Sequence, residues 1–216
     1  MSTLFRPASY EPPYREAVAH LRASDSVMAG IIARVGTCRA RPVRGASHFH
    51  HLTRAIVYQQ LSGKAAATIH RRVCGLFPRR QAHPDHVASI SDAAFRAAGL
   101  SRQKIAYLRD FAHKVRTGAV PLDRVRHMAD DAIIAHLIQV KGIGRWTAQM
   151  FLMFRLGRPD VLPDLDLGIQ NAIHRAYRLR KRPAPRDVQR IGSPWAPYRA
   201  LASWYLWRSL DVDKKQ

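Results

Sequence analysis

Two short segments of the chain hold the residue types that could do chemistry. Residues 137–148 read LIQVKGIGRWTA, which predicts a helix, a tight Gly-x-Gly hairpin and a second helix, because Gly142 and Gly144 allow close approaches that a side chain would block. Exposed N–H groups of such a hairpin, at the start of a helix, suit an anionic oxygen. Residues 163–168 read PDLDLG and place Asp166 where a new helix starts. An anion-binding hairpin followed by a lone acid favours chemistry on DNA over DNA binding alone.

The residues alone allow two interpretations of Asp166. An Asp before an apolar helical run is a common N-cap, and caps are the more frequent role of such an acid. A carboxylate at this point can also act on a substrate, since a helix N-terminus keeps it ionised, and the two roles can coexist. Asp164 is the rival acid, two residues earlier, so the register of the motif needs a test.

The charge balance of the chain is strongly basic. Its 216 residues include 36 Lys and Arg against 15 Asp and Glu, which gives a formal net charge of +21. Such a field concentrates polyanions and makes binding salt-dependent. An anionic membrane is the competing partner, but the sequence has no long basic amphipathic helix and no apolar run of about 20 residues. We therefore expect a nucleic-acid partner and no membrane.

Cysteine usage and the first residues bear on the compartment. Cys38 and Cys74 are the two cysteines, too few for a disulfide framework or a Cys-rich metal site, so a reduced intracellular setting is expected. Residues 1–13 are polar and contain Pro, which predicts neither a secretion signal nor a membrane anchor. A metal cluster at the histidine-rich segment 48–51 is disfavoured, because no Glu, Asp or Cys partner lies at suitable spacing.

The apolar period is helical nearly everywhere, and no convincing strand alternation is found. Length and apolar content allow one compact domain or two small lobes. Asp130 is the predicted N-cap of the helix before the hairpin, and Trp146, Met150 and Phe154 form the predicted inward face of the helix after it. The predicted helices cover about 14–23, 25–35, 48–60, 63–76, 91–98, 102–116, 130–139, 144–156, 166–180, 185–191 and 197–210.

Several dispersed motifs give the chain a resemblance to a known family. They are RAIVYQQLS at 54–62, AGLSRQK at 98–104, the hairpin, the Asp-Leu-Gly segment at 166–168 and Trp-x-Pro-x-Arg at 195–199. In this order they resemble the helix-hairpin-helix superfamily of base-excision DNA glycosylases, specifically the alkylation-repair branch of 3-methyladenine DNA glycosylase II. The resemblance covers most of the chain.

The resemblance implies an all-α, two-lobed helix-hairpin-helix DNA glycosylase fold, with the active site in the cleft between the lobes. Residues 1–216 would form a single glycosylase unit. The family's fold implies that residues from about 40 to 157, hairpin included, form one lobe. Residues 1–39 and 158–216 would combine into the other.

The implied reaction is hydrolysis of the N-glycosidic bond of alkylated purines in DNA, of the 3-methyladenine type. It is the first step of base excision repair and requires flipping of the damaged base. Asp166 matches the family's catalytic carboxylate, which stabilises the oxocarbenium-like sugar and activates water. Leu165 stands where relatives often have a second acid. Superfamily members that also cleave the strand carry Lys where this chain has Trp146, so a monofunctional hydrolase is expected.

The resemblance also implies DNA-contacting and base-pocket residues. Leu61 matches the wedge that fills the gap left by the flipped base, although a helix-end core position is the alternative. Aromatic faces suit a cationic base, but core packing is the usual role of a helical Trp. The expected pocket residues are Trp207, Trp146 and, more weakly, Tyr58. The expected DNA-binding residues are Gln60, Leu61, Ser62, Gly142, Gly144, Arg145 and Thr147.

Hydrolysis of this kind requires no redox or metal cofactor. The four-cysteine iron–sulfur cluster of some superfamily members cannot be built from two cysteines. The resemblance does suggest a structural sodium or potassium ion held by the backbone carbonyls of Ile138, Val140 and Ile143.

Two function classes remain open at this point. The first is a monofunctional glycosylase that acts on double-stranded DNA as a monomer, inside the cell and associated with DNA (cytoplasm or nucleoid if bacterial). The second is a noncatalytic helix-hairpin-helix module, which would keep Gly142 and Gly144 but would not need Asp166. Within the first class, an alternative is a glycosylase for other damaged bases, such as deaminated or etheno purines.

Overall fold

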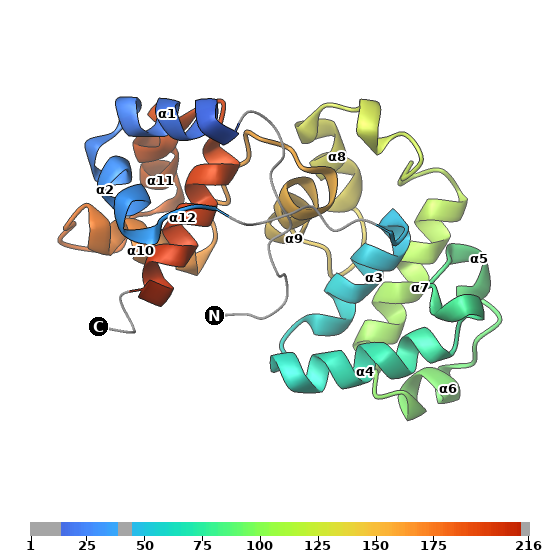
Figure 1. Ribbon diagram of the computed structural model, residues 1–216. Coiled ribbons are helices and arrows are strands. Elements are labelled where there is room, and N and C mark those ends of the chain that lie inside the picture. Colours follow the sequence, from blue (N-terminus) through green and yellow to red (C-terminus); the bar gives the residue numbers. More distant parts are fainter. Residues whose placement is uncertain (1–13, 39–44, 213–216) are drawn as a thin grey trace. The chain divides into compact units, whose positions relative to one another are not determined.

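The computed structural model describes residues 14–38 and 45–212, and its regular elements in these ranges are all helical (Figure 1). The predicted all-α class is therefore confirmed. Contacts divide the described residues into two compact units. Unit 1 holds residues 14–38 and 152–212, and unit 2 holds residues 45–151. None of the described helices is long and apolar enough to cross a membrane.

Unit 1 is built from both ends of the described chain. Its helices are α1 (Tyr14–Ser24), α2 (Ser26–Val35), α10 (Leu167–Ala176), α11 (Pro185–Gly192) and α12 (Arg199–Val212), with a π-helical turn at Leu152–Leu156 and a 3₁₀ turn at Ser193–Trp195. α12 is the central element, because it packs against both α2 and α10.

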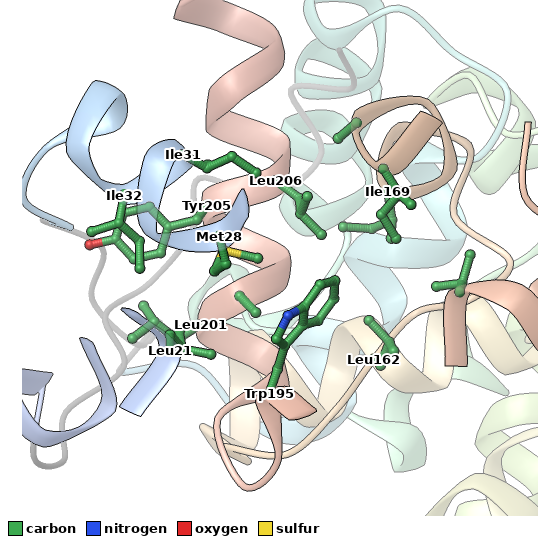
Figure 2. Packing of buried hydrophobic residues seen from close by; sticks show 14 of the residues in the cluster. Leu21, Met28, Ile31, Ile32, Leu162, Ile169, Trp195, Leu201, Tyr205 and Leu206 are labelled. Carbon is green, nitrogen blue, oxygen red and sulfur yellow. The ribbon is translucent and has the colours of Figure 1, made fainter. Parts of the chain in front are cut away.

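The core of unit 1 forms around α12 (Figure 2). Tyr205 and Leu206 of this helix are fully buried, as are Met28 of α2, Ile169 of α10 and Trp195. Segments distant in sequence supply these side chains, so their packing fixes α10, and with it the start of that helix at Asp166. Burial of large apolar side chains is worth about 1.5–3 kcal/mol each, which makes this cluster the main stabilising feature of the unit.

A charged group supports this core from its edge. Asp25 is the N-cap of α2, and its Oδ1 accepts a hydrogen bond of 3.0 Å from the N–H of Met28. Its Oδ2 accepts from Trp195 Nε1 at 2.8 Å and from the hydroxyl of Tyr177. Burial, together with the hydrogen bond to Asp25 and its charge, raises the pKa of Tyr177. One carboxylate thus joins α2, the end of α10 and the 3₁₀ turn.

Unit 2 is the continuous middle of the chain. Its helices are α3 (His48–Tyr58), α4 (Gly63–Gly75), α5 (Pro84–Val87), α6 (Asp92–Ala97), α7 (Arg102–Arg116), α8 (Asp130–Leu137) and α9 (Arg145–Phe151), with 3₁₀ turns at Pro78–Arg80 and Val125–His127. α7 packs against α3, α5 and α6. Phe111 of α7 stacks on Phe49 of α3, with the ring centroids 4.5 Å apart.

Several predicted helix ends differ from the observed ones. α3 ends at Tyr58 rather than residue 60, because Gln60 has a left-handed backbone with φ 55°. α10 ends at Ala176 rather than residue 180, and Arg178 nearby is left-handed with φ 50°. The predicted helix 144–156 is α-helical to Phe151 and then becomes π-helical.

Two further predictions of local structure were wrong. No helix was predicted at α5, although Pro84 at its start suits the first turn of a helix. The N-cap of α8 is Ala129, so Asp130 lies inside the first turn instead of capping it. An acid in the first turn still interacts favourably with the helix dipole.

We expect Asp25→Ala to lower the free energy of unfolding by about 3 kcal/mol, because the Trp195 and Tyr177 donors lose their acceptor. Urea unfolding followed by circular dichroism measures this. Ser101→Ala is a suitable control, since Ser101 caps a single helix through one 3.3 Å bond to Lys104 N–H and should cost about 1 kcal/mol. A loss for Asp25→Ala no larger than that of the control would contradict the joining role of this carboxylate.

Candidate functional site

The predicted hairpin lies between α8 and α9 of unit 2. Its turn is closed by backbone bonds from Val140 N–H to Leu137 O at 3.1 Å and from Ile143 N–H to Val140 O at 3.0 Å. Lys141, Gly144 and Arg145 are exposed. Within unit 2, the start of α9 is therefore accessible to a ligand. The structure thus places an exposed Gly-x-Gly turn before a helix, and the binding of an anion there stays a prediction.

Different physical reasons explain why glycine stands at each of the two hairpin positions. Gly142 has φ 81°, and a Cβ placed on it would lie 2.1 Å from Cδ2 of Tyr107. The free protein therefore requires glycine at this position. At Gly144, by contrast, φ is not positive and no heavy atom of the described residues lies within 4 Å of an added Cβ. Only an approaching ligand would need the space that Gly144 leaves.

Residues of α7 hold the hairpin in place. Asp110 Oδ2 accepts a hydrogen bond of 2.8 Å from the N–H of Lys141. The Lys114 ammonium lies 2.7 Å from both oxygens of the same carboxylate. Burial alone would raise the pKa of Asp110, but the hydrogen bonds and charges of Lys114 and Lys141 outweigh it and hold this pKa below its usual range. The ionised carboxylate fixes the turn.

The predicted wedge loop, which we define as residues 59–62, connects α3 to α4 in unit 2. Gln60 and Ser62 are exposed and Leu61 is half-buried. Ser62 is the N-cap of α4, but its side chain makes no capping bond. The three residues predicted to contact DNA here are thus at least partly accessible on this unit.

Asp166 is the N-cap of α10 in unit 1, which confirms the cap interpretation. Its Oδ1 accepts hydrogen bonds of 2.9 Å from the N–H of Ile169 and of 2.9 Å from Trp207 Nε1. Leu165 and Leu167 on either side are exposed. Gly168 makes the close indole–carboxylate contact possible, since a Cβ there would lie 2.9 Å from Asp166 Oδ1 and 3.0 Å from Trp207 Cδ1.

The rival acid Asp164 is tied into the protein. Its Oδ2 accepts a hydrogen bond of 3.0 Å from Gln189 Nε2 of α11, and its backbone oxygen accepts one of 2.9 Å from Gln170 Nε2. Its Oδ1 is buried, with no hydrogen-bond partner among the described residues. This acid links the loop to α10 and α11. Asp166, in contrast, caps α10 and lies between two exposed residues, Leu165 and Leu167.

The predicted pocket aromatics differ in accessibility. Trp207 and Trp146 are half-buried, and the Trp207 ring lies 5.8 Å from that of Phe154. Tyr58 is only 5% exposed, with the Arg54 guanidinium 4.2 Å from its ring centroid. Thr147, predicted to bind DNA, is only 7% exposed. Little of Tyr58 or Thr147 is available to a ligand in this conformation, and both assignments stay predictions.

The carbonyls of Ile138, Val140 and Ile143 remain a prediction for a structural alkali ion. Carbonyl oxygens are the kind of ligand that hard cations prefer. Val140 O already accepts the turn bond from Ile143 N–H at 3.0 Å, but a carbonyl has a second lone pair. The second lone pair of Val140 O is therefore compatible with the predicted ion.

The histidine-rich segment has a partner that the sequence did not reveal. His50 lies beside His70 and Cys74 of α4, with one ligating atom of each within 4.8 Å of the others. Cys74 Sγ is 3.4 Å and 3.8 Å from the two ring nitrogens of His70, so the sulfur faces the ring edge. Burial raises the pKa of the Cys74 thiol, and His50 Nδ1 accepts from Ala82 N–H at 3.1 Å. The expectation that no Cys lies near this segment is therefore corrected, because folding brings Cys74 and His70 of α4 beside His50.

The contacts of α7 residues with the hairpin were not predicted from the sequence. The spacing of Tyr107 and Asp110 places them on one helix face, but periodicity does not say what that face meets.

Comparison with known proteins agrees with this geometry. Residues 53–197 match the HhH-GPD superfamily of base excision DNA repair proteins, a range that includes the wedge loop, the hairpin and Asp166. The chain belongs to this superfamily. It is 34% identical over 201 residues to DNA-3-methyladenine glycosylase 1 of Schizosaccharomyces pombe, covering 90% of this chain and 86% of that one. It is also 34% identical over 171 residues to the YfjP protein of Bacillus subtilis, but spans 60% of that protein's length.

Solved structures show the same fold. The S. pombe 3-methyladenine DNA glycosylase Mag1, in complex with abasic DNA, superposes with a TM-score of 0.78 at 34% identity, covering 89% of this chain and 95% of that one. The DNA-3-methyladenine glycosidase of Bacillus halodurans superposes with a TM-score of 0.83 at 33% identity, covering 98% of this chain and 95% of that one.

We expect the two hairpin glycines to separate folding from DNA binding. Gly142→Ala should lower the free energy of unfolding by about 2 kcal/mol or more, because its φ and Tyr107 oppose a Cβ. Gly144→Ala should change that energy by less than about 1 kcal/mol. It should nevertheless weaken binding to duplex DNA regardless of sequence, since phosphate contacts position a duplex without reading bases. Thermal unfolding and titration of labelled duplex at several salt concentrations measure both. Unchanged affinity of Gly144→Ala would remove the hairpin from the binding surface.

We also expect His70 to make stability depend on pH. Burial first, then the charges of His50 and Arg54, lowers the pKa of His70 from 6.5 to about 4. Between these values the unfolded chain binds more protons than the folded one, so stability falls as pH falls through this window. The loss should be about 2 kcal/mol, reduced by partial exposure of the ring. Urea unfolding at pH 7, 5.5 and 4 should show a shallower pH dependence for His70→Asn, and equal slopes would contradict this.

Proposed function

We propose that this protein is a monofunctional DNA glycosylase that hydrolyses the N-glycosidic bond of alkylated purines of the 3-methyladenine type. This is the first step of base excision repair. Membership of the base excision superfamily and the named glycosylases at 34% identity support the class. The observation that carries the proposal is the carboxylate of Asp166, held at the N-terminus of α10 by Ile169 and Trp207.

A single carboxylate suits this reaction. Methylation at N3 or N7 makes the purine cationic, so the bond from C1′ to the base breaks with the electron pair leaving on a neutral base. Positive charge develops on the deoxyribose, as in other oxocarbenium-like glycosyl transfers. An ionised Asp166 stabilises that charge, and water then adds to C1′ and loses a proton. No strong general acid is required.

The surroundings of Asp166 fix its orientation. The N–H of Ile169 and the indole N–H of Trp207 both donate to Oδ1. Two hydrogen bonds that meet at one oxygen restrict the rotation of the carboxylate at the start of α10. Trp207 therefore has two proposed roles, as a donor that orients Asp166 and as an aromatic face for the cationic base.

The proposal assigns DNA binding and base extrusion to unit 2. The hairpin N–H groups at Gly142 and Gly144, with Arg145, bind phosphate, while Leu61, flanked by Gln60 and Ser62, fills the gap left by the flipped nucleotide. Trp146 occupies the position of the strand-cleaving lysine, which supports simple hydrolysis. Because the substrate is double-stranded DNA, we place the protein inside the cell. We also expect it to act as a monomer.

We expect Asp166→Asn to lower the single-turnover excision rate by at least about 10²-fold, or roughly 2.7 kcal/mol. An Asn Oδ1 can still accept from Ile169 and Trp207, so the cap and the fold should survive. DNA affinity should not fall in parallel, because removing an acid from a basic protein does not weaken attraction to phosphate. Release of free methylpurine from alkylated duplex, with counting of abasic sites, gives the rate.

Asp164→Asn is the matched control, since Asp164 holds Gln189 through Oδ2 and should retain most activity. If Asp164→Asn lost excision while Asp166→Asn kept it, the assignment would be wrong by two residues. If the wild type bound damaged duplex but released no base of any kind, the noncatalytic module would be the better reading. Release of deaminated or etheno purines in preference to methylpurines would change the proposed substrate, and because these bases are neutral the reaction would also need a proton donor for the leaving base.

A further inference from the structure

The wedge loop and the hairpin are joined by the side chain of Gln59, a residue of the 54–62 motif to which the sequence analysis gave no role. Gln59, the first residue of the wedge loop, donates from Nε2 to the backbone oxygen of Gly142 at 2.6 Å. The two residues are 83 positions apart in sequence. The link therefore ties the loop that carries Leu61 directly to the turn that offers N–H groups to phosphate.

The wedge loop needs such support because its backbone is poorly held by itself. Gln60 has φ 55°, a conformation that residues other than glycine rarely adopt. The backbone bonds across the end of α3 are long, 3.4 Å from Gln59 N–H to Ile56 O and 3.4 Å from Leu61 N–H to Tyr58 O. A residue in a sparsely populated backbone region persists only when its surroundings hold it there.

Lys104 of α7 supplies a second support. Its Nζ donates at 2.7 Å to Val57 O and at 2.7 Å to Gln59 O, two carbonyls at the end of α3. The end of an α-helix leaves its last carbonyls without partners, and a cation there is favourable. Burial lowers the pKa of Lys104, so this side chain is desolvated in holding the loop.

The supports come from one face of α7. Lys104, Tyr107 and Asp110 follow each other at three-residue spacing, which places them on the same side of a helix. Lys104 holds the end of α3, Tyr107 lies against Gly142, and Asp110 holds the N–H of Lys141. Residues of one helix, α7, thus contact both the wedge loop and the hairpin. The Gln59 side chain joins the two segments by a hydrogen bond.

We propose that Gln59 and Lys104 are positioning residues for base extrusion, which hold Leu61 in fixed register with the phosphate-binding hairpin. The proposal rests on the proposed glycosylase function. Phosphate binding at the hairpin carries no sequence information and does not by itself unstack a base. A rigid link lets that binding drive Leu61 into the stack, which offsets the loss of pairing and stacking. Without this link, the wedge loop would change conformation when it met the duplex, and Leu61 would not enter the base stack.

The test compares a methylpurine in a paired duplex with the same base in an unpaired bulge. Gln59→Met removes one hydrogen bond and Lys104→Met removes two, and each should lower the single-turnover excision rate from the duplex by about tenfold or more. The rate from the bulge should fall less than about twofold, because a base that is already unpaired needs less help to leave the stack. Activity on the bulge also shows that the variants are folded.

Matched controls separate positioning from general effects. Gln81→Met makes the same chemical change at an exposed position of unit 2, and Lys181→Met removes the same charge from an exposed position of unit 1. Neither should distinguish the two substrates. If Gln59 acts through Leu61, the double variant Gln59→Met/Leu61→Ala should be no slower on duplex than Leu61→Ala alone. Additive losses, or equal losses on both substrates, would overturn the proposal.

A readout without bond cleavage distinguishes this proposal from the glycosylase function. Fluorescence of 2-aminopurine beside the damaged base rises when the base leaves the stack. At saturating protein, Gln59→Met and Lys104→Met should give a smaller rise than wild type, Gln81→Met and Lys181→Met. A wild type that gives this rise but releases no base would refute the glycosylase function and leave the positioning role standing. A full rise with Gln59→Met and Lys104→Met would refute the positioning role alone.

Discussion

Helix ends leave backbone N–H and C=O groups without partners, and this protein satisfies several of them with charged side chains that hold other parts as well. Asp25 caps α2 and also receives Trp195 and Tyr177. Lys104 takes the last carbonyls of α3, and Asp166 caps α10 while it receives Trp207. A charge desolvated for one such bond is costly, so a group that makes several is better compensated. Hydrogen bonds at the helix ends therefore add to the contacts between the apolar faces of the helices.

The observed cap and the proposed chemistry of Asp166 place compatible demands on one residue. A cap must be an acceptor that points at free N–H groups, and a group that stabilises a sugar cation must be an ionised acid held rigidly. The start of α10 provides both conditions, because the same hydrogen bonds that stabilise the helix orient the carboxylate. Gly168 adds a steric condition, since a side chain there would separate the Trp207 indole from Asp166. The cap interpretation and the catalytic proposal therefore support each other.

The predictable parts of the structure were those that depend on neighbours in sequence. The helical period, the turn at residues 141–144 and the cap at Asp166 all follow from residues within about four positions of each other. The ends of α3 and α10 were less well predicted, because left-handed residues that are not glycine carry no clear signal in sequence. The change from α to π at Leu152 was likewise not visible, since both helices place apolar residues on one side.

By itself, the sequence determined the helical class, the basic charge, the hairpin and the acid that follows it, because residue type and spacing decide these features locally. It also carried enough dispersed motifs to indicate the family. Only the tertiary structure decided which glycine is needed for folding, since Tyr107 reaches Gly142 across 35 positions and nothing described reaches Gly144. It alone showed that Asp164 accepts a hydrogen bond from Gln189 whereas Asp166 accepts one from Trp207. It alone joined Gln59 to the hairpin, because hydrogen bonds between distant segments depend on packing and leave no periodic trace in the chain.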